Sequence, residues 1–328
     1  MISREALFAY VESGTLPSGP LTVHVDIINR CNLRCPSCWN HSPLVPRKKP
    51  DRDAVLDMKG FERIRSELKA AGVGKVMLSG GGEPFLHPGI YAMISGLKDA
   101  GMHVTVLSNG MLIDPLRIER NPPDRIILNY CASRQAEDRA LHRDLLERIN
   151  RTVPLSLVLV TDSTAVDQVI PLVEAALDFP DIQVTFKPAS LSAETVRLAL
   201  SGEDREKLLN TILPRVRELC ENRGIPHNIG MFEDQLAGTG PAGDASETGC
   251  YAGIFYSRIY VNGDVFFCCA HIKTGNLYES SFAEIWKSEK YRAIRNSLKE
   301  GRFFPCCSQC GKYNLNYRAA EMLKGSGR

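Results

Sequence analysis

Several features that would place a protein in a membrane, outside the cell or on nucleic acid are absent from this sequence of 328 residues. There is no run of about 18 apolar residues, which excludes a transmembrane helix. The 40 Lys and Arg nearly balance the 38 Asp and Glu, so a net charge of +2 gives no footprint for nucleic acid or an anionic membrane. Residues 1–14 lack the basic-then-apolar order of a secretory signal. We therefore expect a cytoplasmic protein that binds neither a membrane nor nucleic acid.

Cysteine, by contrast, is abundant, with 11 residues. In a protein that is not exported, thiols stay reduced, so this number indicates metal or redox chemistry rather than a disulfide framework. The chain length suggests about two domains. The sequence therefore poses the question of what the cysteines hold.

The first 190 residues alternate between short apolar runs and amphipathic stretches, which predicts repeated βαβ units and a parallel sheet. The predicted strands cover residues 21–27, 75–79, 104–108, 125–129, 155–161 and 183–187. The predicted helices cover residues 58–71, 89–100, 137–150 and 166–178. Six strands are too few for an eight-stranded barrel. We therefore predict an α/β fold, a partial (β/α)6 TIM-like barrel with its site at the carboxyl ends of the strands.

The pattern changes after residue 190. A long helix is predicted over 204–223, with a kink near Pro214, because proline cannot donate to the helical ladder. Residues 236–249 have the composition of a linker. Beyond it, the turn Asn262-Gly263-Asp264 predicts a hairpin of two strands, 254–260 and 265–268, followed by one or two helices over 281–299.

These patterns divide the chain into three parts: a barrel core (1–189), connecting helices with a linker (190–249) and a small C-terminal hairpin-plus-helix domain (250–328). The last part is too small to have much of a core, so a metal staple would make physical sense there.

Cys31, Cys35 and Cys38 follow the first predicted strand with the spacing C-x3-C-x2-C. A zinc site or coincidental buried thiols are the simpler alternatives. Zinc would need a fourth local ligand, and His41, the one candidate nearby, has a spacing unlike the usual finger patterns. Three thiolates on a 4Fe–4S cluster leave one iron open to a small molecule, which is a catalytic arrangement.

The run from Arg30 to Cys38 resembles the signature loop of the radical S-adenosylmethionine (radical SAM) enzymes. The resemblance implies a 4Fe–4S cluster whose open iron binds S-adenosylmethionine through its amino and carboxylate groups. It also implies reductive cleavage to a 5′-deoxyadenosyl radical that abstracts hydrogen from the substrate. Ser37 departs from the usual aromatic residue, and we assign the place near the adenine to Trp39.

The segment Ser79-Gly80-Gly81-Gly82-Glu83 follows the second predicted strand. Taken alone, it favours an ordinary glycine-rich turn. At a strand end after the cysteine loop, however, it resembles the Gly-Gly-Glu motif of the same family, which assigns Gly81, Gly82 and Glu83 to the methionyl amino group. Three polar residues at the ends of the third and fourth strands are placed near the cofactor in the same way: Ser108, Asn109 and Asn129.

Four further thiolates suit either tetrahedral zinc or a fully ligated 4Fe–4S cluster, and spacing alone favours zinc: Cys250, Cys268, Cys307 and Cys310. Their pattern, with Gly263 followed by four residues and Cys268 and then C-x2-C, resembles the start of the SPASM/twitch extension, which binds auxiliary iron–sulfur clusters in radical SAM enzymes. No cysteine follows Cys310, so we expect the shorter twitch form with one auxiliary cluster. The segment looks most like the twitch region of 2-deoxy-scyllo-inosamine dehydrogenase.

Two cysteine doublets leave the choice of ligand open, and spacing favours Cys268 and Cys307. Their neighbours, Cys269 and Cys306, are then either small buried thiols or hydrogen-atom donors to a substrate radical, as radical SAM epimerases require. Two other cysteines are interpreted as buried thiols, the first also as a weaker donor candidate: Cys131 and Cys220.

We therefore predict a radical SAM oxidoreductase or epimerase with S-adenosylmethionine and two 4Fe–4S clusters, served by an electron donor such as flavodoxin or ferredoxin. About 20 residues precede the first strand, which leaves no room for a peptide-recognition domain. This favours a small polyol, sugar or aminoglycoside-type substrate. The alternatives are a ribosomally made peptide recognised through a partner protein, a non-catalytic iron–sulfur electron carrier and a zinc-stapled binding protein.

Overall fold

The fold is taken from a computed structural model of the chain. The structure describes residues 4–14, 16, 19–45, 51–131, 143–177, 179, 181–238, 249–268, 272–304, 307 and 313–324. None of the helices in these ranges is long and apolar enough to cross a membrane.

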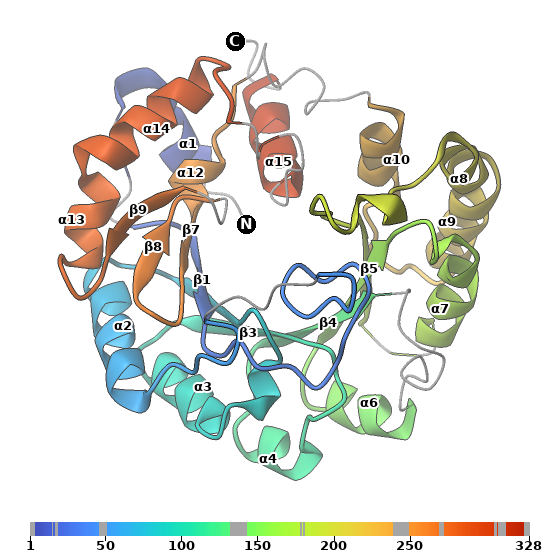
Figure 1. The fold of residues 1–328 in the computed structure, drawn as a ribbon, viewed down its shortest axis with the longest axis horizontal. Coiled ribbons are helices and arrows are strands. Elements are labelled where there is room, and N and C mark those ends of the chain that lie inside the picture. The colour runs from blue at the N-terminus through green and yellow to red at the C-terminus, as the bar shows by residue number, and fades with distance from the viewer. Residues whose placement is uncertain are drawn as a thin grey trace.

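A curved sheet with the strand order β6-β5-β4-β3-β2-β1-β7-β8-β9 forms the centre of the molecule. Six strands pair in parallel and in chain order, as predicted: β1 (Thr22–Asp26), β2 (Lys75–Ser79), β3 (His103–Ser108), β4 (Arg125–Cys131), β5 (Leu155–Thr161) and β6 (Gln183–Pro188). Figure 1 shows the sheet curving round with helices on its outer side. The predicted partial (β/α)6 barrel is confirmed.

The outer layer follows from the spacing of apolar residues. Its helices are α2 (Met58–Ala70), α3 (Ile90–Asp99), α4 (Pro115–Arg120), α6 (Arg143–Asn150) and α7 (Val169–Ala176), the last preceded by a 3₁₀ turn (Val166–Gln168). Phe61, Ile64 and Leu68 recur at helical spacing on α2 and share one core with Val23 and Val25 of β1. Successive side chains of a strand point to opposite faces, so His24 and Asp26, which alternate with these valines, face the interior of the barrel.

The predicted helix over 204–223 is interrupted ahead of its proline. It consists of α8 (Gly202–Lys207), a π-helical turn (Leu208–Ile212) and α9 (Leu213–Asn222). Pro214 lies in the first turn of α9. Proline is tolerated there because the first N–H groups of a helix have no partner within that helix. A short 3₁₀ turn (Val196–Leu198) precedes this segment, and α10 (Ile229–Ala237) follows it.

The C-terminal strands extend the sheet of the barrel. β7 (Tyr256–Ile259) pairs in parallel with β1, and β8 (Asp264–Phe266) and β9 (Lys273–Asn276) add antiparallel strands beyond it. The first residues of the predicted strand form a short helix, α12 (Ala252–Phe255). The predicted turn holds, with Gly263 at a φ of 79° that suits glycine.

The remaining helices close the C-terminal part. α13 (Phe282–Lys287) and α14 (Glu289–Lys299) are the two predicted helices, divided at Ser288, whose hydroxyl caps the second. α1 (Arg4–Ser13) and α15 (Tyr313–Lys324) were not predicted. They meet at α12 through a second apolar cluster that includes Leu7, Phe255 and Ala319. The first and last helices of the described chain, α1 and α15, therefore contact each other.

Candidate functional site

The loop after β1 carries the first cysteine set. The side chains of Cys31, Cys35 and Cys38 are all partly exposed. The backbone N–H of Leu33 donates to Cys31 Sγ at 3.4 Å, and that of His41 donates to Cys38 Sγ at 3.2 Å. Hydrogen bonds from backbone N–H groups favour the thiolate, which is the form that binds iron. Three partly exposed thiols, two of them supported in this way, fit a cluster with one iron left open.

The same loop does not fit zinc. His41 is already engaged, because its Nε2 donates to the carbonyl of Asn29 at 2.6 Å and its Nδ1 accepts from Arg52. Burial lowers the pKa of His41, which suits this neutral ring. Within the ranges that the structure describes, no three His, Cys, Asp or Glu side chains converge on one ion. Cysteines of a 4Fe–4S cluster each bind a different iron, so their sulfurs surround the cluster and do not meet at one ion.

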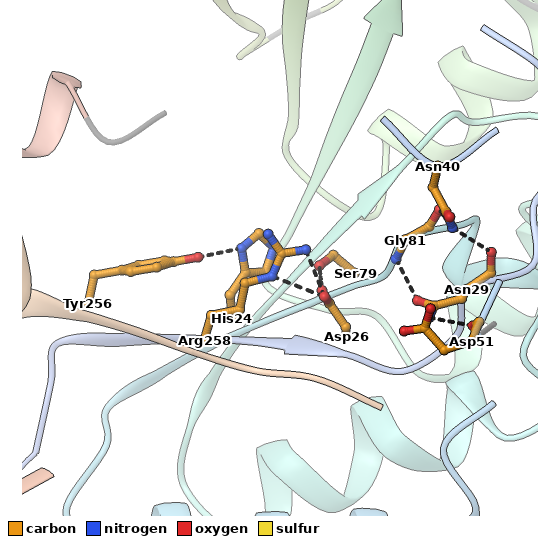
Figure 2. A network of polar contacts seen from close by, with 9 residues as sticks. All are labelled: His24, Asp26, Asn29, Asn40, Asp51, Ser79, Gly81, Tyr256 and Arg258. Atoms are coloured by element: carbon orange, nitrogen blue, oxygen red, sulfur yellow. Dashed lines mark hydrogen bonds and ion pairs between the residues drawn. The ribbon is translucent and has the colours of Figure 1, made fainter. Parts of the chain in front are cut away.

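The glycine-rich segment after β2 packs directly on the cysteine loop. A Cβ on Gly80 would lie 1.8 Å from the carbonyl oxygen of Ile28, and a Cβ on Gly82 would lie 1.8 Å from that of Arg30. Gly81 is held on both sides, since its N–H donates to Asn29 Oδ1 at 3.1 Å and its carbonyl accepts from Asn40 Nδ2 at 2.9 Å (Figure 2). Any side chain at Gly80 or Gly82 would therefore force the two loops apart.

Glu83 joins the ends of β2 and β3. It is 2% exposed, and its carboxylate accepts hydrogen bonds from Ser108 Oγ at 2.8 Å and from the backbone N–H of Asn109 at 2.7 Å. Asn109 Nδ2 in turn donates to Asn32 Oδ1, next to Cys31, at 2.8 Å. The structure thus brings three predicted site residues, Glu83, Ser108 and Asn109, together beside the cysteine loop. These partners of the Glu83 carboxylate are groups of the protein. Its contact with the methionyl amino group stays a prediction.

For the other predicted site residues, the structure gives the exposure of the side chain or no description. Trp39 is 40% exposed on the cysteine loop, and Asn129 is partly buried on β4. Cys220 is fully buried in the core on α9, and burial raises the pKa of its thiol to about 11, which favours the neutral thiol at neutral pH. Three predicted residues lie outside the described ranges, as does the side chain of a fourth: Cys269, Cys306, Cys310 and Cys131.

Three members of the second cysteine set are described. Cys250, Cys268 and Cys307 are partly exposed and pack against the main core. Cys250 N–H donates to the carbonyl of Leu298 on α14 at 2.8 Å, and Cys307 N–H donates to that of Phe304 at 2.9 Å. Segments far apart in the sequence thus supply these thiols.

A buried polar network that the sequence reasoning missed joins β1 to β7 (Figure 2). Asp26 accepts from Arg258 Nη2 at 2.7 Å and from Ser79 Oγ at 2.9 Å, and His24 Nδ1 is 2.8 Å from the hydroxyl of Tyr256. Asp26 is 1% exposed. The available signal was the alternation of His24 and Asp26 with valines in a buried strand, which placed both polar side chains inside the barrel.

Two family models match the chain. One, described as the Radical SAM superfamily, covers residues 25–129, and the other, described as an iron–sulfur cluster-binding domain (SPASM), covers residues 250–311. The protein is therefore a two-part iron–sulfur enzyme. It belongs to the radical SAM enzymes with a C-terminal SPASM/twitch domain, and this architecture implies S-adenosylmethionine and two iron–sulfur clusters.

Among curated proteins, the chain is 30% identical over 105 residues to a PqqA peptide cyclase of Gluconobacter oxydans, a match that covers 32% of this chain and 28% of that protein. It is 25% identical over 177 residues to an S-adenosylmethionine-dependent nucleotide dehydratase of Selenomonas ruminantium, covering 48% and 62%. The match thus spans about a quarter of the length of the peptide cyclase.

Solved structures share the fold. Streptococcus suis SuiB bound to its precursor peptide SuiA matches with a TM-score of 0.65 and 17% identity, covering 95% of this chain and 76% of that one. The protein anSMEcpe, with bound AdoMet and a Kp18Cys peptide, matches with a TM-score of 0.59 and 16% identity, covering 91% and 88%.

These findings correct one expectation. A small polyol, sugar or aminoglycoside-type substrate was predicted, and that prediction is wrong, because the PqqA peptide cyclases and SuiB are proteins named for, or solved with, a peptide. The error came from taking the short stretch before the first strand as a sign of substrate class.

Proposed function

We propose that this protein is a radical SAM enzyme that modifies a ribosomally made peptide. The similarity to the PqqA peptide cyclases, at 30 to 34% identity over about a hundred residues, carries the proposal. The likeness in fold to SuiB, which was solved with its precursor peptide, agrees with it. The Radical SAM family model covers residues 25–129, which contain the cysteine and glycine loops.

Within this function, the cysteine loop holds the catalytic cluster through Cys31, Cys35 and Cys38. When bound there, S-adenosylmethionine supplies a 5′-deoxyadenosyl radical that removes a hydrogen atom from the substrate. The chain's own part is positioning. Glu83, Ser108 and Asn109 fix the ends of β2 and β3 beside the loop with hydrogen bonds of 2.7 and 2.8 Å. A reaction centre fixed in this way requires little rearrangement during the reaction.

The second cysteine set would hold an auxiliary cluster that completes an oxidation. Cys250, Cys268, Cys307 and Cys310 would hold this cluster, which would supply an electron acceptor for an oxidation that removes two hydrogens from the peptide. The pairing of β7 with β1 supports this, because it attaches the C-terminal domain to the strand that leads into the cysteine loop. An electron donor such as flavodoxin or ferredoxin would reduce the catalytic cluster.

Mass spectrometry of candidate peptides tests the proposal. The reconstituted protein is incubated with S-adenosylmethionine, dithionite and peptides encoded by short reading frames beside its gene. We expect 5′-deoxyadenosine together with a peptide that has lost two hydrogen atoms. A Cys35→Ala variant is the control and should give neither. Cleavage of S-adenosylmethionine with every such peptide left unchanged would contradict the proposal.

A further inference from the structure

Arg295 on α14 is a buried cation without an acidic partner in the part of the chain that the structure describes. It is 3% exposed, its Nε donates to the carbonyl of Gly253 at 3.1 Å, and its Nη1 donates to that of Trp286 at 2.9 Å. Its Nη2 is buried and makes no hydrogen bond. The guanidinium packs on the rings of both Trp286 and Tyr291, with its carbon 4.1 Å from each ring centroid.

This arrangement leaves a positive charge uncompensated. Burial lowers the pKa of Arg295 to about 10, which is still well above neutrality, so the charge persists at pH 7. Burying an unpaired charge typically costs several kcal/mol. Cation–π contacts and two backbone carbonyls offset part of that cost. A nearby anion would offset the rest.

Two of the groups that contact Arg295, Gly253 and Tyr291, lead to segments that carry cysteines of the second set. Gly253, which accepts its Nε–H, follows Cys250 by three residues, and Leu298 on the same helix accepts the N–H of Cys250 at 2.8 Å. Tyr291, which stacks on the guanidinium, has its hydroxyl 3.5 Å from the carbonyl of Phe267, the residue before Cys268. Arg295 therefore contacts the segment that begins at Cys250 and a side chain that reaches the segment ending at Cys268.

The chemistry of the implied cofactor supplies the missing anion. An oxidised 4Fe–4S core carries a charge of +2, so four thiolate ligands give a site of charge −2, which becomes −3 on reduction. A fixed cation in a poorly solvated wall stabilises the more negative, reduced form. We propose that Arg295 is the counter-charge of the auxiliary cluster and that it raises the reduction potential of that cluster, so that the cluster accepts an electron more readily.

This role rests on the auxiliary cluster and not on the identity of the substrate, so its test needs no peptide. The full chain is reconstituted anaerobically as wild type, Arg295→Gln and Arg295→Lys, and each is titrated with a reductant while EPR follows the clusters. A Cys31→Ala/Cys35→Ala/Cys38→Ala background identifies the auxiliary signal. The matched control is Arg292→Gln, which removes an exposed arginine of the same helix that pairs with Glu289.

In Arg295→Gln we expect the ratio of reduced to oxidised auxiliary cluster at a fixed potential to fall at least tenfold, which corresponds to a shift of about 59 mV for one electron. The catalytic cluster should not shift. Arg295→Lys should restore the wild-type value, and Arg292→Gln should keep it. An Arg295→Gln protein that holds about eight irons with an unchanged auxiliary potential would overturn the proposal. Loss of the cluster in both the Gln and Lys variants would equally overturn it, because that result indicates a packing role; loss in the Gln variant alone, with a normal potential in the Lys variant, would support it.

Discussion

The two cysteine sites of this protein are built in opposite ways. The catalytic loop takes its three cysteines from eight consecutive residues, 31–38, and is fixed by hydrogen bonds from the loops that follow β2 and β3. The C-terminal site draws Cys250, Cys268 and Cys307 from three separate segments that pack against the main core. A local, polar frame supports the first site, whereas aromatic packing supports the second.

The difference matches what each site must do. A cluster that binds a small molecule needs an accessible iron and closely spaced backbone groups, and glycine allows the loops to approach within the required distance. A cluster that exchanges electrons needs a dry, well-packed wall that sets its potential. Next to Cys268, three aromatic rings pack together: the ring centroid of Tyr291 lies 4.8 Å from that of Phe267 and 4.8 Å from that of Trp286. Substitutions in the two regions should therefore fail in different ways.

Removing one ligand from each site should have the largest effect. Cys35→Ala should abolish cleavage of S-adenosylmethionine, and iron should fall from about eight to about four per chain. Cys307→Ala should lose the same amount of iron yet still cleave S-adenosylmethionine with dithionite, without forming modified peptide. Iron analysis and chromatography of 5′-deoxyadenosine measure both. Cys220→Ala, in a buried thiol that is not a ligand, is the control. Loss of cleavage in Cys307→Ala would break the distinction between the two sites.

A methyl group between the cysteine and glycine loops should be nearly as damaging to the first site and harmless to the second. In Gly82→Ala the new Cβ would lie 1.8 Å from the carbonyl oxygen of Arg30, so the loops must separate. We expect most S-adenosylmethionine cleavage to be lost while the auxiliary cluster keeps its EPR signal. Gly74→Ala, just before β2, has nothing within 4 Å of its Cβ and should behave as wild type. Full cleavage by Gly82→Ala would show that the close approach is dispensable.

The buried ion pair between Asp26 on β1 and Arg258 on β7 links the two regions, and its contribution to stability can be measured. Arg258→Met would leave the Asp26 carboxylate buried and unpaired, which costs about 3–5 kcal/mol of unfolding free energy. Asp26→Leu/Arg258→Met should recover most of that loss. Arg65→Met, which breaks the exposed pair with Glu62, should change stability by less than about 1 kcal/mol. Urea unfolding measures all three. If the double variant were as unstable as Arg258→Met, the pair would do more than neutralise a buried charge.

The smallest expected effect concerns Glu83. In Glu83→Gln, one of the hydrogen bonds from Ser108 or Asn109 would meet an amide N–H instead of an oxygen. Hydrogen bonds to a charged group contribute about 1.5–3 kcal/mol, so affinity for S-adenosylmethionine should fall by roughly tenfold or more. Equilibrium binding to the reconstituted protein measures this. Ser108→Ala removes only one of the bonds to the carboxylate and should lower the affinity less. Equal affinity of wild type and Glu83→Gln would exclude Glu83 from positioning the site.

Much of the first site was predictable because its determinants are local. The C-x3-C-x2-C spacing, the glycines after β2 and the polar residues that end β3 each follow a strand, and parallel strands bring their carboxyl ends to one edge. The network of Asp26 and Arg258 was not predictable, because it depends on a pairing between residues 232 apart. No short-range pattern specifies which strand β7 joins.

Local patterns along the chain were enough to predict the six-stranded partial barrel and the C-x3-C-x2-C loop, because strand and helix periodicity and this spacing involve neighbouring residues. The cofactors followed from the resemblance to radical SAM enzymes, since the spacing of the second cysteine set also suits zinc. Three features emerged only from the folded chain: the C-terminal strands continue the same sheet, Glu83 links two strand ends, and Arg295 is buried without an acidic partner among the described residues. Those features arise from contacts between distant segments, and their energies depend on burial, which no local pattern of residues fixes.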